Sequence, residues 1–235
     1  MNIVITGASG GIGYEVVKRL SKDNHSVIAI ARNDDKLLQL KQECLRVNKE
    51  SKLHIYANDI SAIESTDIKI YLEEIKLSHI DVLINNAGNL INKPFMQLND
   101  ADWRQVYTTN VFSAVKLIKH FYPYLKKSIQ PHIVNITSMG GINGTSKFAG
   151  LAAYSSSKGA LSVLTECLAE EFKNDNIRVN ALALGSVQTE MFSKAFPGFK
   201  APLTSVQMGE YIAWFAENGN KFFNGKILPV ALSTP

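Results

Sequence analysis

The sequence contains only two cysteines among its 235 residues, Cys44 and Cys167. They lie far apart, each in a segment with helical spacing, so we expect neither a disulfide nor the paired spacing of a zinc site. We interpret both as buried structural thiols. The five histidines are scattered and match no metal-binding motif, and we expect them on the surface or partly buried. The sequence therefore predicts no metal site.

Long apolar runs and blocks of basic residues are also missing. No stretch reaches the ~18–20 apolar residues of a membrane helix, and no basic n-region precedes the strand-like NIVIT at residues 2–6. Lysine and arginine number 25 against 21 aspartate and glutamate residues, and this excess of +4 is scattered. Nucleic acids and anionic membranes would require basic patches. We therefore expect a cytoplasmic protein without a nucleic-acid or membrane partner.

What the sequence does have is a regular alternation of two hydrophobic patterns. Short β-branched runs alternate with longer segments of helical spacing. Strands separated by helices indicate βαβ units and a parallel sheet covered on both faces. Because there is no linker or repeat, we predict a single α/β domain over residues 1–235, a doubly wound three-layer α/β/α sandwich. Its seven strands are expected at residues 3–6, 26–31, 53–57, 80–85, 132–137, 177–182 and 226–230.

The helical segments carry apolar stripes that should face the sheet. The first predicted helix has the stripe Ile12, Val16, Val17 and Leu20. Two later stripes consist of Leu37, Leu40 and Leu45, and of Val106, Val111, Val115 and Ile118.

The segment TGASGGIG, residues 6–13, joins the first predicted strand to the first helix. Gly7, Gly11 and Gly13 follow the spacing G-x-x-x-G-x-G, which permits a tight turn and a close backbone approach to phosphate. The helix N-terminus would offer free N–H groups and positive dipole character to a pyrophosphate. A P-loop would need a lysine, and none occurs in this segment. A glycine turn alone can be merely a turn, but its place between strand and helix favours a dinucleotide site.

No acidic residue stands at the end of the second predicted strand, where a carboxylate would bind the ribose 2′-OH and repel a 2′-phosphate. Ala31 and Arg32 occupy that place. Because a guanidinium binds phosphate well, we predict NADP(H) as the preferred cofactor, with NAD(H) as the alternative. Arg32 could otherwise be a solvated loop residue. Asp59, after the third strand, is a candidate acceptor for the adenine amino group.

Together, the motifs make the chain resemble the classical short-chain dehydrogenases/reductases over nearly its whole length, and it looks similar to the 3-oxoacyl-ACP reductases among them. The resemblance implies a Rossmann-like sheet of seven parallel strands, a bound NAD(P)(H), and assembly as a homodimer or homotetramer. The motifs that carry it, in family order, are TGASGGIG, ANDIS (57–61), NNAG (85–88), Asn110, Ser138 in NITSM, YSSSK (154–158), IRVNALALG (177–185) and TEM (189–191).

The resemblance assigns catalytic roles to Asn110, Ser138, Tyr154 and Lys158. Tyr154 would exchange a proton with the substrate oxygen, and Ser138 would orient that oxygen by a hydrogen bond. Asn110 would hold a water that links Lys158 to solvent. Lowering a phenol pKa from about 10 to about 7 requires about 4 kcal/mol. A unit charge about 4 Å away supplies roughly that much at an effective dielectric near 20. Because Lys158 lies one helical turn after Tyr154, we expect its ammonium to lower the pKa of Tyr154.

The same resemblance gives the candidate cofactor-binding residues, and it implies no metal ligand. Val187 and Thr189 would meet the nicotinamide carboxamide, and the Lys158 amine would hold the nicotinamide ribose. The serines 155–157 are interpreted as spacers without a catalytic role. The complete candidate set is Gly7, Ser9, Gly11, Ile12, Gly13, Arg32, Asp59, Ile60, Asn86, Ala87, Gly88, Tyr154, Lys158, Gly185, Val187 and Thr189.

The chain departs from the family pattern at three places. Ser138 and Tyr154 are 16 residues apart, whereas the family commonly places them about three residues closer. The extra length should bulge from the loop 139–153 beside the substrate. Leu184 stands where the family usually has a proline, which can loosen the loop after the sixth strand. The segment between the sixth and seventh strands is compact, and the end GKILPVALSTP lacks the usual Asp-Gly-Gly. We therefore expect a small lid over the substrate.

These patterns predict an NADPH-dependent oxidoreductase that reduces a ketone or aldehyde to an alcohol, with Tyr154 as general acid–base. The resemblance to the 3-oxoacyl-ACP reductases places 3-oxoacyl thioesters first among the small-molecule carbonyl or alcohol substrates. Sugars and quinones are the alternatives. A different class of function is a non-catalytic NADP-binding sensor or scaffold. Such a protein would have no need to keep Asn110, Ser138, Tyr154 and Lys158 together.

Overall fold

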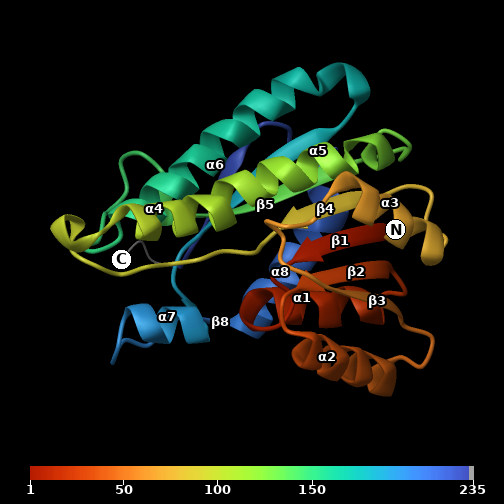
Figure 1. Ribbon diagram of the computed structural model, residues 1–235, viewed down its shortest axis with the longest axis horizontal. Helices are drawn as coiled ribbons and strands as arrows, with labels where there is room; N and C mark the ends of the chain where they lie inside the picture. The colour runs from red at the N-terminus through yellow and green to blue at the C-terminus, as the bar shows by residue number, and fades with distance from the viewer. Residues whose placement is uncertain (233–235) are drawn as a thin grey trace.

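The computed structural model describes residues 1–232 and contains one seven-stranded sheet with the order β3-β2-β1-β4-β5-β6-β9 (Figure 1). Every pair in this sheet is parallel, and the strand order reverses at β1, which confirms the predicted doubly wound sheet. The predicted domain over residues 1–235 includes 233–235, which lie outside the described part. The strands are β1 (Asn2–Thr6), β2 (Ser26–Ala31), β3 (Lys52–Ala57), β4 (Val82–Asn85), β5 (His132–Ser138), β6 (Arg178–Leu184) and β9 (Ile227–Val230).

The central strands are apolar almost throughout because helices cover both faces of the sheet. In β1, Ile3 and Ile5 belong to one hydrophobic cluster and Val4 to the other, as the alternation of side chains along a strand requires. All three side chains are fully buried. The two clusters are the two cores of the sandwich, one on each side of the sheet.

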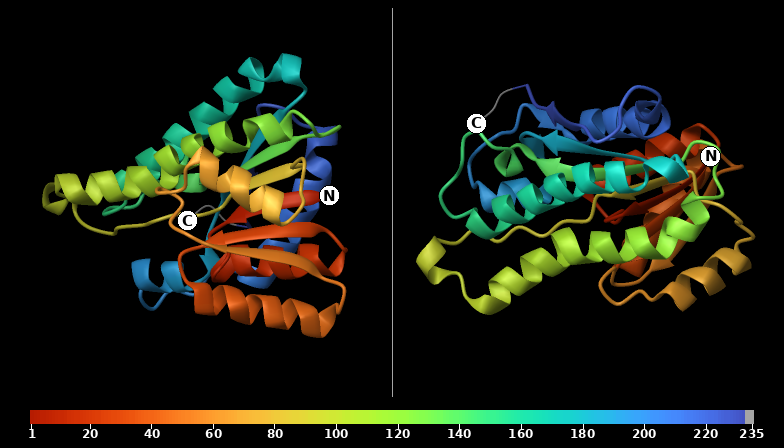
Figure 2. Two further views of the ribbon diagram at one scale, coloured as in Figure 1. Left: turned by 45° about the vertical axis from the view of Figure 1, so that its right-hand side comes forward. Right: turned by 90° about the horizontal axis from the view of Figure 1, so that it is seen from above.

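The helices form two layers (Figures 1 and 2). One layer holds α1 (Gly11–Lys22), α2 (Asp34–Val47) and α8 (Ser205–Asn218). The other holds α3 (Ser65–Glu74), α5 (Ser113–Leu125), which continues α4 (Asp100–Tyr107), and α6 (Ala152–Glu171). Single 3-10 turns lie at Phe95–Gln97, Met139–Gly141, Lys173–Asp175 and Gly219–Lys221. Within residues 1–232, every helix is too short or too polar to span a membrane.

Two side-chain predictions on the helices are wrong. In α2, Leu45 is 38% exposed and Cys44 takes its place in the buried stripe. Cys44 is therefore a buried thiol as expected, whereas Cys167 is exposed. The reason is helical phase, since the buried face of α6 carries Leu161, Thr165 and Ala169, and Cys167 falls on the opposite side.

His132 is the exception to the expectation that histidines are exposed or partly buried. It begins β5, and its side chain is fully buried. Its Nδ1 lies 3.2 Å from the Ala216 carbonyl oxygen and its Nε2 lies 3.1 Å from Asn180 Nδ2. Burial lowers the pKa of His132 to about 4, so the ring is neutral. Neutral and bonded at both nitrogens, it links β5 to β6 and α8 as a core residue.

One wide turn, the π-helical segment Thr108–Phe112, joins α4 to α5 in a single long helix (Figure 2, right). The N–H of Ser113 donates to the Thr108 carbonyl five residues earlier, and the Ser113 hydroxyl donates to the same oxygen at 2.8 Å. Such turns occur mostly as single bulges inside α-helices, and frequently at functional sites. Asn110 lies in the middle of this one.

A small second sheet lies between β6 and α8 and was not predicted. Val187–Gln188 (β7) pairs with Leu203–Thr204 (β8), and the short helix α7 (Glu190–Ala195) lies between them. The hydroxyl of Thr189 accepts the Phe192 N–H at 3.1 Å and caps α7. This compact unit agrees with the expected small lid.

Candidate active site

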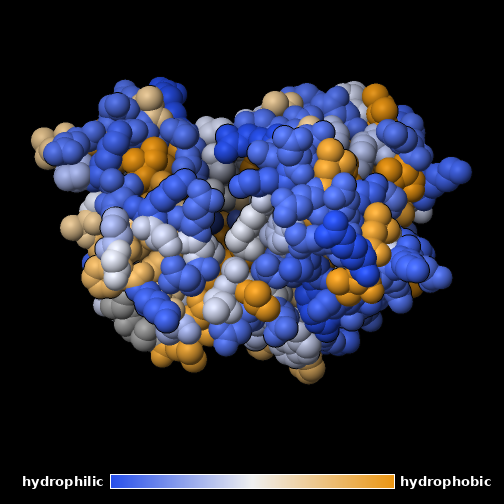
Figure 3. Space-filling model, turned by 90° about the horizontal axis from the view of Figure 1, so that it is seen from below, coloured by the Kyte–Doolittle hydropathy of each residue, from blue (hydrophilic) through white to orange (hydrophobic). Residues whose placement is uncertain are grey.

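A cleft of about 1150 Å³ opens at the carboxyl ends of the parallel strands. Gly7 follows β1 in its wall, Asn86 follows β4, Ser138 ends β5 and Gly185 follows β6. In doubly wound sheets ligands bind beyond the point where the strand order reverses, here between β1 and β4. The space-filling view in Figure 3 shows a hollow between the two halves of the molecule, with hydrophobic residues exposed beside it. All predicted catalytic and cofactor-binding residues line this cleft except Asn110.

The glycine-rich turn is packed too tightly for side chains at two of its positions. Gly7 has φ +70°, and a Cβ built on Gly13 would lie 2.4 Å from the Gly7 carbonyl oxygen and 2.5 Å from Asn86 Nδ2. By contrast, a Cβ on Gly10 would meet no atom within 4 Å. The N-terminus of α1 has no side-chain cap and no acidic residue in its first turn. Its N–H groups and positive dipole end are therefore available to an anion.

The NNAG segment braces this turn from β4. Asn86 Nδ2 donates to the Thr6 carbonyl at 2.9 Å, and the Thr6 hydroxyl accepts the N–H groups of Asn86 and Ala87 at 3.1 and 3.0 Å. Thr6 is the last residue of β1 and is buried. The neighbouring carboxyl ends of β1 and β4 thus hold each other in place beside the cleft.

The rim beyond β2 is basic. Arg32 is exposed directly after the strand, and Lys36 in the first turns of α2 lines the same part of the cleft. Lys36 was not predicted, although its position four residues after Arg32 in a helical segment is visible in the sequence. Asp59 faces this rim, but its Oδ1 accepts from the N–H and hydroxyl of Ser61 at 2.9 and 2.7 Å. These bonds, with Arg32 adding a smaller effect, hold the pKa of Asp59 below its usual range.

Tyr154, Ser138 and Lys158 meet at the centre of the cleft. Tyr154 and Lys158 come from the first turns of α6, and Ser138 is the last residue of β5. The Lys158 ammonium lies 5.9 Å from the centroid of the Tyr154 ring and donates to the Ile136 carbonyl at 2.8 Å. Lys158 is 3% exposed, whereas the Tyr154 side chain is partly exposed to the cleft.

Burial shifts the two groups in opposite directions. It lowers the pKa of Lys158 to about 8. It also raises the pKa of Tyr154, and the neighbouring Ser138 hydroxyl offsets that rise only in part. The pKa of Tyr154 is therefore raised and not lowered as expected, because desolvation of the phenol is the largest effect on it. Tyr154 is a neutral phenol at neutral pH, which is the form of a proton donor.

Asn110 lies behind the cleft wall, where it is buried. Its Oδ1 accepts the Asn89 N–H at 2.7 Å, and its Nδ2 donates to the Asn89 carbonyl at 3.0 Å and to the Ser157 hydroxyl at 2.9 Å. A Cβ built on Gly88 would lie 3.5 Å from Lys158 Nζ and 3.6 Å from Asn110 Oδ1. Gly88 therefore leaves an open space between the amine and the amide.

Ser157 has a clear structural role that the sequence did not reveal. Its hydroxyl donates to the Tyr154 carbonyl at 2.7 Å and accepts from Asn110 Nδ2. It thereby ties the first turn of α6 to the π-helical turn. As one of three consecutive serines, it could not be distinguished by sequence from Ser155 and Ser156.

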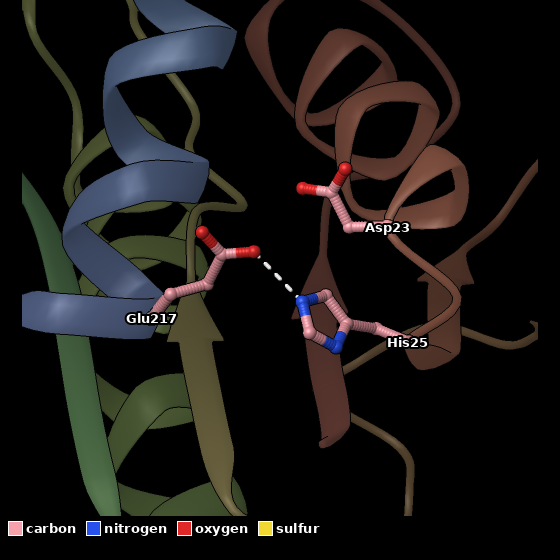
Figure 4. Close-up of side chains that lie close together, drawn as sticks. All are labelled: Asp23, His25 and Glu217. Atoms are coloured by element: carbon pink, nitrogen blue, oxygen red, sulfur yellow. Dashed lines mark hydrogen bonds and ion pairs between the residues drawn. The ribbon is translucent and has the colours of Figure 1, made fainter.

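A second cluster of polar side chains lies away from the cleft, between α1 and α8 (Figure 4). Ligand-type atoms of Asp23, His25 and Glu217 lie within 4.8 Å of one another. His25 Nε2 contacts Glu217 Oε1 at 2.7 Å, and its Nδ1 lies 3.3 Å from the amino group of Met1. Asp23 forms an ion pair with Arg19. Both ring nitrogens and both carboxylates thus have protein partners, and we interpret the cluster as a polar link between the two helices.

Comparison with known proteins shows the family of the chain. The family model for short chain dehydrogenases matches residues 1–198. An uncharacterised oxidoreductase of Staphylococcus saprophyticus is 34% identical over 192 residues, covering 80% of this chain and 75% of the relative. A fatty acyl-CoA reductase of Acinetobacter baylyi is 29% identical over 192 residues, covering 81% of this chain and 63% of the relative.

Solved structures share the fold over nearly the full length. A structure described as a short-chain dehydrogenase of Shigella flexneri complexed with NADP superposes with a TM-score of 0.87 at 26% identity. The match covers 97% of this chain and 95% of the other. Fold, motif order and family match coincide, and the chain belongs to the short-chain dehydrogenase family of oxidoreductases.

Proposed function

We propose that this protein reduces a small-molecule carbonyl compound to an alcohol, with NADPH as cofactor. The observation that carries the proposal is the meeting of Tyr154, Ser138 and Lys158 in the same cleft as the glycine-rich turn. A non-catalytic NADP-binding protein would need the turn and the basic rim but not a phenol held beside a serine hydroxyl.

The described residues fit a dinucleotide. The close packing of Gly7 against Gly13 and the uncapped N-terminus of α1 would seat the pyrophosphate, and Lys158 would hold the nicotinamide ribose. Val187 and Thr189 line the cleft where the carboxamide would lie. When bound, NADPH supplies the hydride that adds to the carbonyl carbon.

The protein side chains manage the proton and the orientation. Ser138 donates a hydrogen bond to the carbonyl oxygen and fixes its position. Tyr154, a neutral phenol, donates its hydroxyl proton to the same oxygen, so that hydride and proton together give the alcohol. The Lys158 ammonium stabilises the tyrosinate that remains. The space that Gly88 leaves between Lys158 and Asn110 would hold the water that returns a proton.

Replacement of Tyr154 by phenylalanine tests the reaction. Because Tyr154→Phe removes the proton donor and little volume, we expect kcat for NADPH-dependent ketone reduction to fall at least about 100-fold. NADPH affinity, measured by fluorescence titration, should stay within about threefold. The control is Tyr211→Phe, which changes a tyrosine of α8 outside the cleft lining. Unchanged turnover in Tyr154→Phe would falsify the role of Tyr154.

The preference for NADP(H) is proposed from Arg32 and Lys36 on the rim beyond β2. The NADP in the Shigella flexneri relative supports it. Because charge-assisted bonds contribute about 1.5–3 kcal/mol, Arg32→Asp should lower the NADPH/NADH ratio of kcat/KM at least about tenfold. The control Arg46→Asp places the same charge change in the last turn of α2, away from the rim. An unaltered ratio in Arg32→Asp would mean that Arg32 makes no contact with the 2′-phosphate.

Among carbonyl substrates, 3-oxoacyl thioesters remain the first choice, and sugars and quinones are the alternatives. The Acinetobacter baylyi relative is a fatty acyl-CoA reductase, which supports an acyl thioester as substrate. By the same resemblance we propose a homodimer or homotetramer.

A further inference from the structure

The part of the cleft beside α7 has an apolar wall built from three separate segments. Phe148 and Leu151 come from the lengthened loop before α6, Phe192 and Phe196 from α7 and its end, and Leu90 from the segment after β4. The Phe148 and Phe196 rings meet edge to face with centroids 5.6 Å apart, and the centroids of Phe192 and Phe196 are 5.2 Å apart. Leu151 directly precedes α6 and lies three residues before Tyr154. The wall therefore adjoins the proton donor.

This wall is held together by hydrogen bonds to backbone carbonyls as well as by contacts between the phenylalanines. Asn92 Nδ2 donates to the Ala195 carbonyl of α7 at 2.8 Å, and the Lys93 N–H donates to the Gly150 carbonyl at 3.0 Å. Gly150 has φ +87°, and a Cβ there would lie 2.0 Å from Asn92 Oδ1. Residues 92 and 93 thus fasten α7 to the loop that carries Phe148.

The same segment is anchored on its other side. Lys93 Nζ bonds both carboxylate oxygens of Asp102 at 2.9 and 2.8 Å. Asp102 also accepts the Asn99 N–H in the capping box of α4. The positions of Phe148 and Phe196 are therefore set before any ligand arrives, which favours binding because little ordering remains.

Three of the polar side chains that line the cleft near this wall, Asn92, Thr145 and Lys194, are already engaged. The Asn92 amide donates to α7, and the Thr145 hydroxyl donates to backbone carbonyls of its own loop. Lys194 of α7 is paired with Glu190 at 2.6 Å. A substrate body placed here would meet aromatic and aliphatic carbon first, and burying hydroxyl groups against such carbon is unfavourable.

We propose that this wall binds an extended apolar body, an alkyl or aryl chain attached to the reducible carbonyl, with Phe148 and Phe196 as specificity-determining residues. The inference rests on the proposed function and deepens it: the substrates are hydrophobic ketones rather than sugars. It also assigns a purpose to the lengthened loop, whose residues place Phe148 opposite α7 and Gly150 against Asn92.

A homologous series of ketones tests the inference. With NADPH and the wild-type protein, we measure kcat/KM for 2-butanone, 2-hexanone and 2-octanone, and for the hydroxylated four-carbon ketone erythrulose. A fully buried methylene corresponds to about a fourfold gain, and each step of the series adds two methylenes, so kcat/KM should rise by up to about 16-fold at each step. Erythrulose should be reduced less efficiently than 2-butanone. A flat series, or erythrulose above 2-butanone, would overturn the apolar assignment.

Variants of Phe148 and Phe196 test whether the wall causes the rise in kcat/KM along the ketone series. Phe148→Ala and Phe196→Ala should flatten the series, so that kcat/KM for 2-octanone falls toward that for 2-butanone. Phe148→Leu should restore most of the gain, because it returns apolar volume. Phe222→Ala removes a phenylalanine that is 71% exposed and outside the cleft lining, and it should keep the wild-type series. If the two alanine variants keep the full gain, the wall does not bind the chain.

Failure of the proposed function can be told apart from failure of this inference. If no ketone is reduced, the proposed reductase activity is wrong, and the wall is then judged by binding. Calorimetry on the NADP-loaded protein should show 2-octanol binding at least tenfold more tightly than 2-butanol, with this difference reduced in Phe148→Ala. Equal affinity for the two alcohols would overturn the inference by itself.

Discussion

Replacing Lys158 by methionine should stabilise the protein while abolishing its proposed activity. Lys158 is 3% exposed, and its amine has one hydrogen bond, to the Ile136 carbonyl, and no carboxylate partner among the residues described. Burying a charge without a counterion is unfavourable. Methionine has nearly the same length and shape and carries no charge.

The size of the expected stabilisation follows from the pKa of Lys158. Burial lowers the pKa of Lys158 from 10.5 to about 8, and at about 1.36 kcal/mol per pKa unit this corresponds to about 3.4 kcal/mol at neutral pH. Removing the bond to the Ile136 carbonyl costs about 1 kcal/mol. Lys158→Met should therefore raise the free energy of unfolding by about 2 kcal/mol at pH 7, or the melting temperature by roughly 4–8 °C for a chain of this size.

The pH dependence gives the sharper test. Between about pH 8 and 10.5 the unfolded wild-type chain binds more protons at Lys158 than the folded protein does, so wild-type stability rises with pH in this window relative to the variant. The advantage of Lys158→Met should shrink above pH 8 and nearly vanish at roughly pH 9.5.

Urea unfolding at pH 7 and pH 9.5, followed by circular dichroism, measures the difference. The control Lys173→Met removes an exposed lysine just after α6, whose ion pair with Glu170 is on the surface, and should change stability by less than about 0.5 kcal/mol at both pH values. A variant that is less stable than wild type at pH 7, or equally favoured at both pH values, would refute this reasoning.

Two further substitutions test the supports of the site. Gly13→Ala should destabilise the fold by about 1–3 kcal/mol, because its Cβ would overlap Gly7, whereas Gly10→Ala should change stability by less than about 0.5 kcal/mol; equal unfolding midpoints in urea would contradict this. Ser157→Ala leaves the buried Asn110 amide without one acceptor, so we expect kcat to fall about tenfold and the apparent pKa in the pH–rate profile to move. Ser157→Thr keeps a hydroxyl and should restore both kcat and the pH–rate profile. An unmoved profile in Ser157→Ala, or no recovery in Ser157→Thr, would reduce Ser157 to a packing role.

The fold could be predicted from sequence because its determinants are local and repeated. Each of the seven strands is a short, mostly apolar run, and segments of helical spacing lie between them along the chain. The short strands β7 and β8 escaped prediction because two residues each carry no periodicity. Leu45 was misplaced because Cys44, one residue earlier, takes the buried position, and Cys167 because its burial was expected from residue type and not from helical phase.

The residues of the candidate site could be proposed from the sequence, but the pKa values of its side chains could not. Residues such as Tyr154 and Gly13 are marked by motif and order, and the structure brings them to one cleft. The pKa of Tyr154 could not be read from the spacing to Lys158, because desolvation depends on everything packed around both side chains. The role of Ser157 likewise depends on Asn110, which is 47 residues away in the chain.

The π-helical turn at Thr108–Phe112 changes how the sequence of the long helix must be read. Each residue of an α-helix advances about 100° around the axis, so a five-residue step between Val106 and Val111 would place them on different sides of a regular helix. Both are buried because the wider turn resets the angular register between α4 and α5. The deletion of one residue from this turn would rotate the whole of α5 relative to α4 and carry Asn110 away from Ser157. The five-residue spacing between Val106 and Val111 thus marks in the sequence the wider turn on which the geometry behind Lys158 depends.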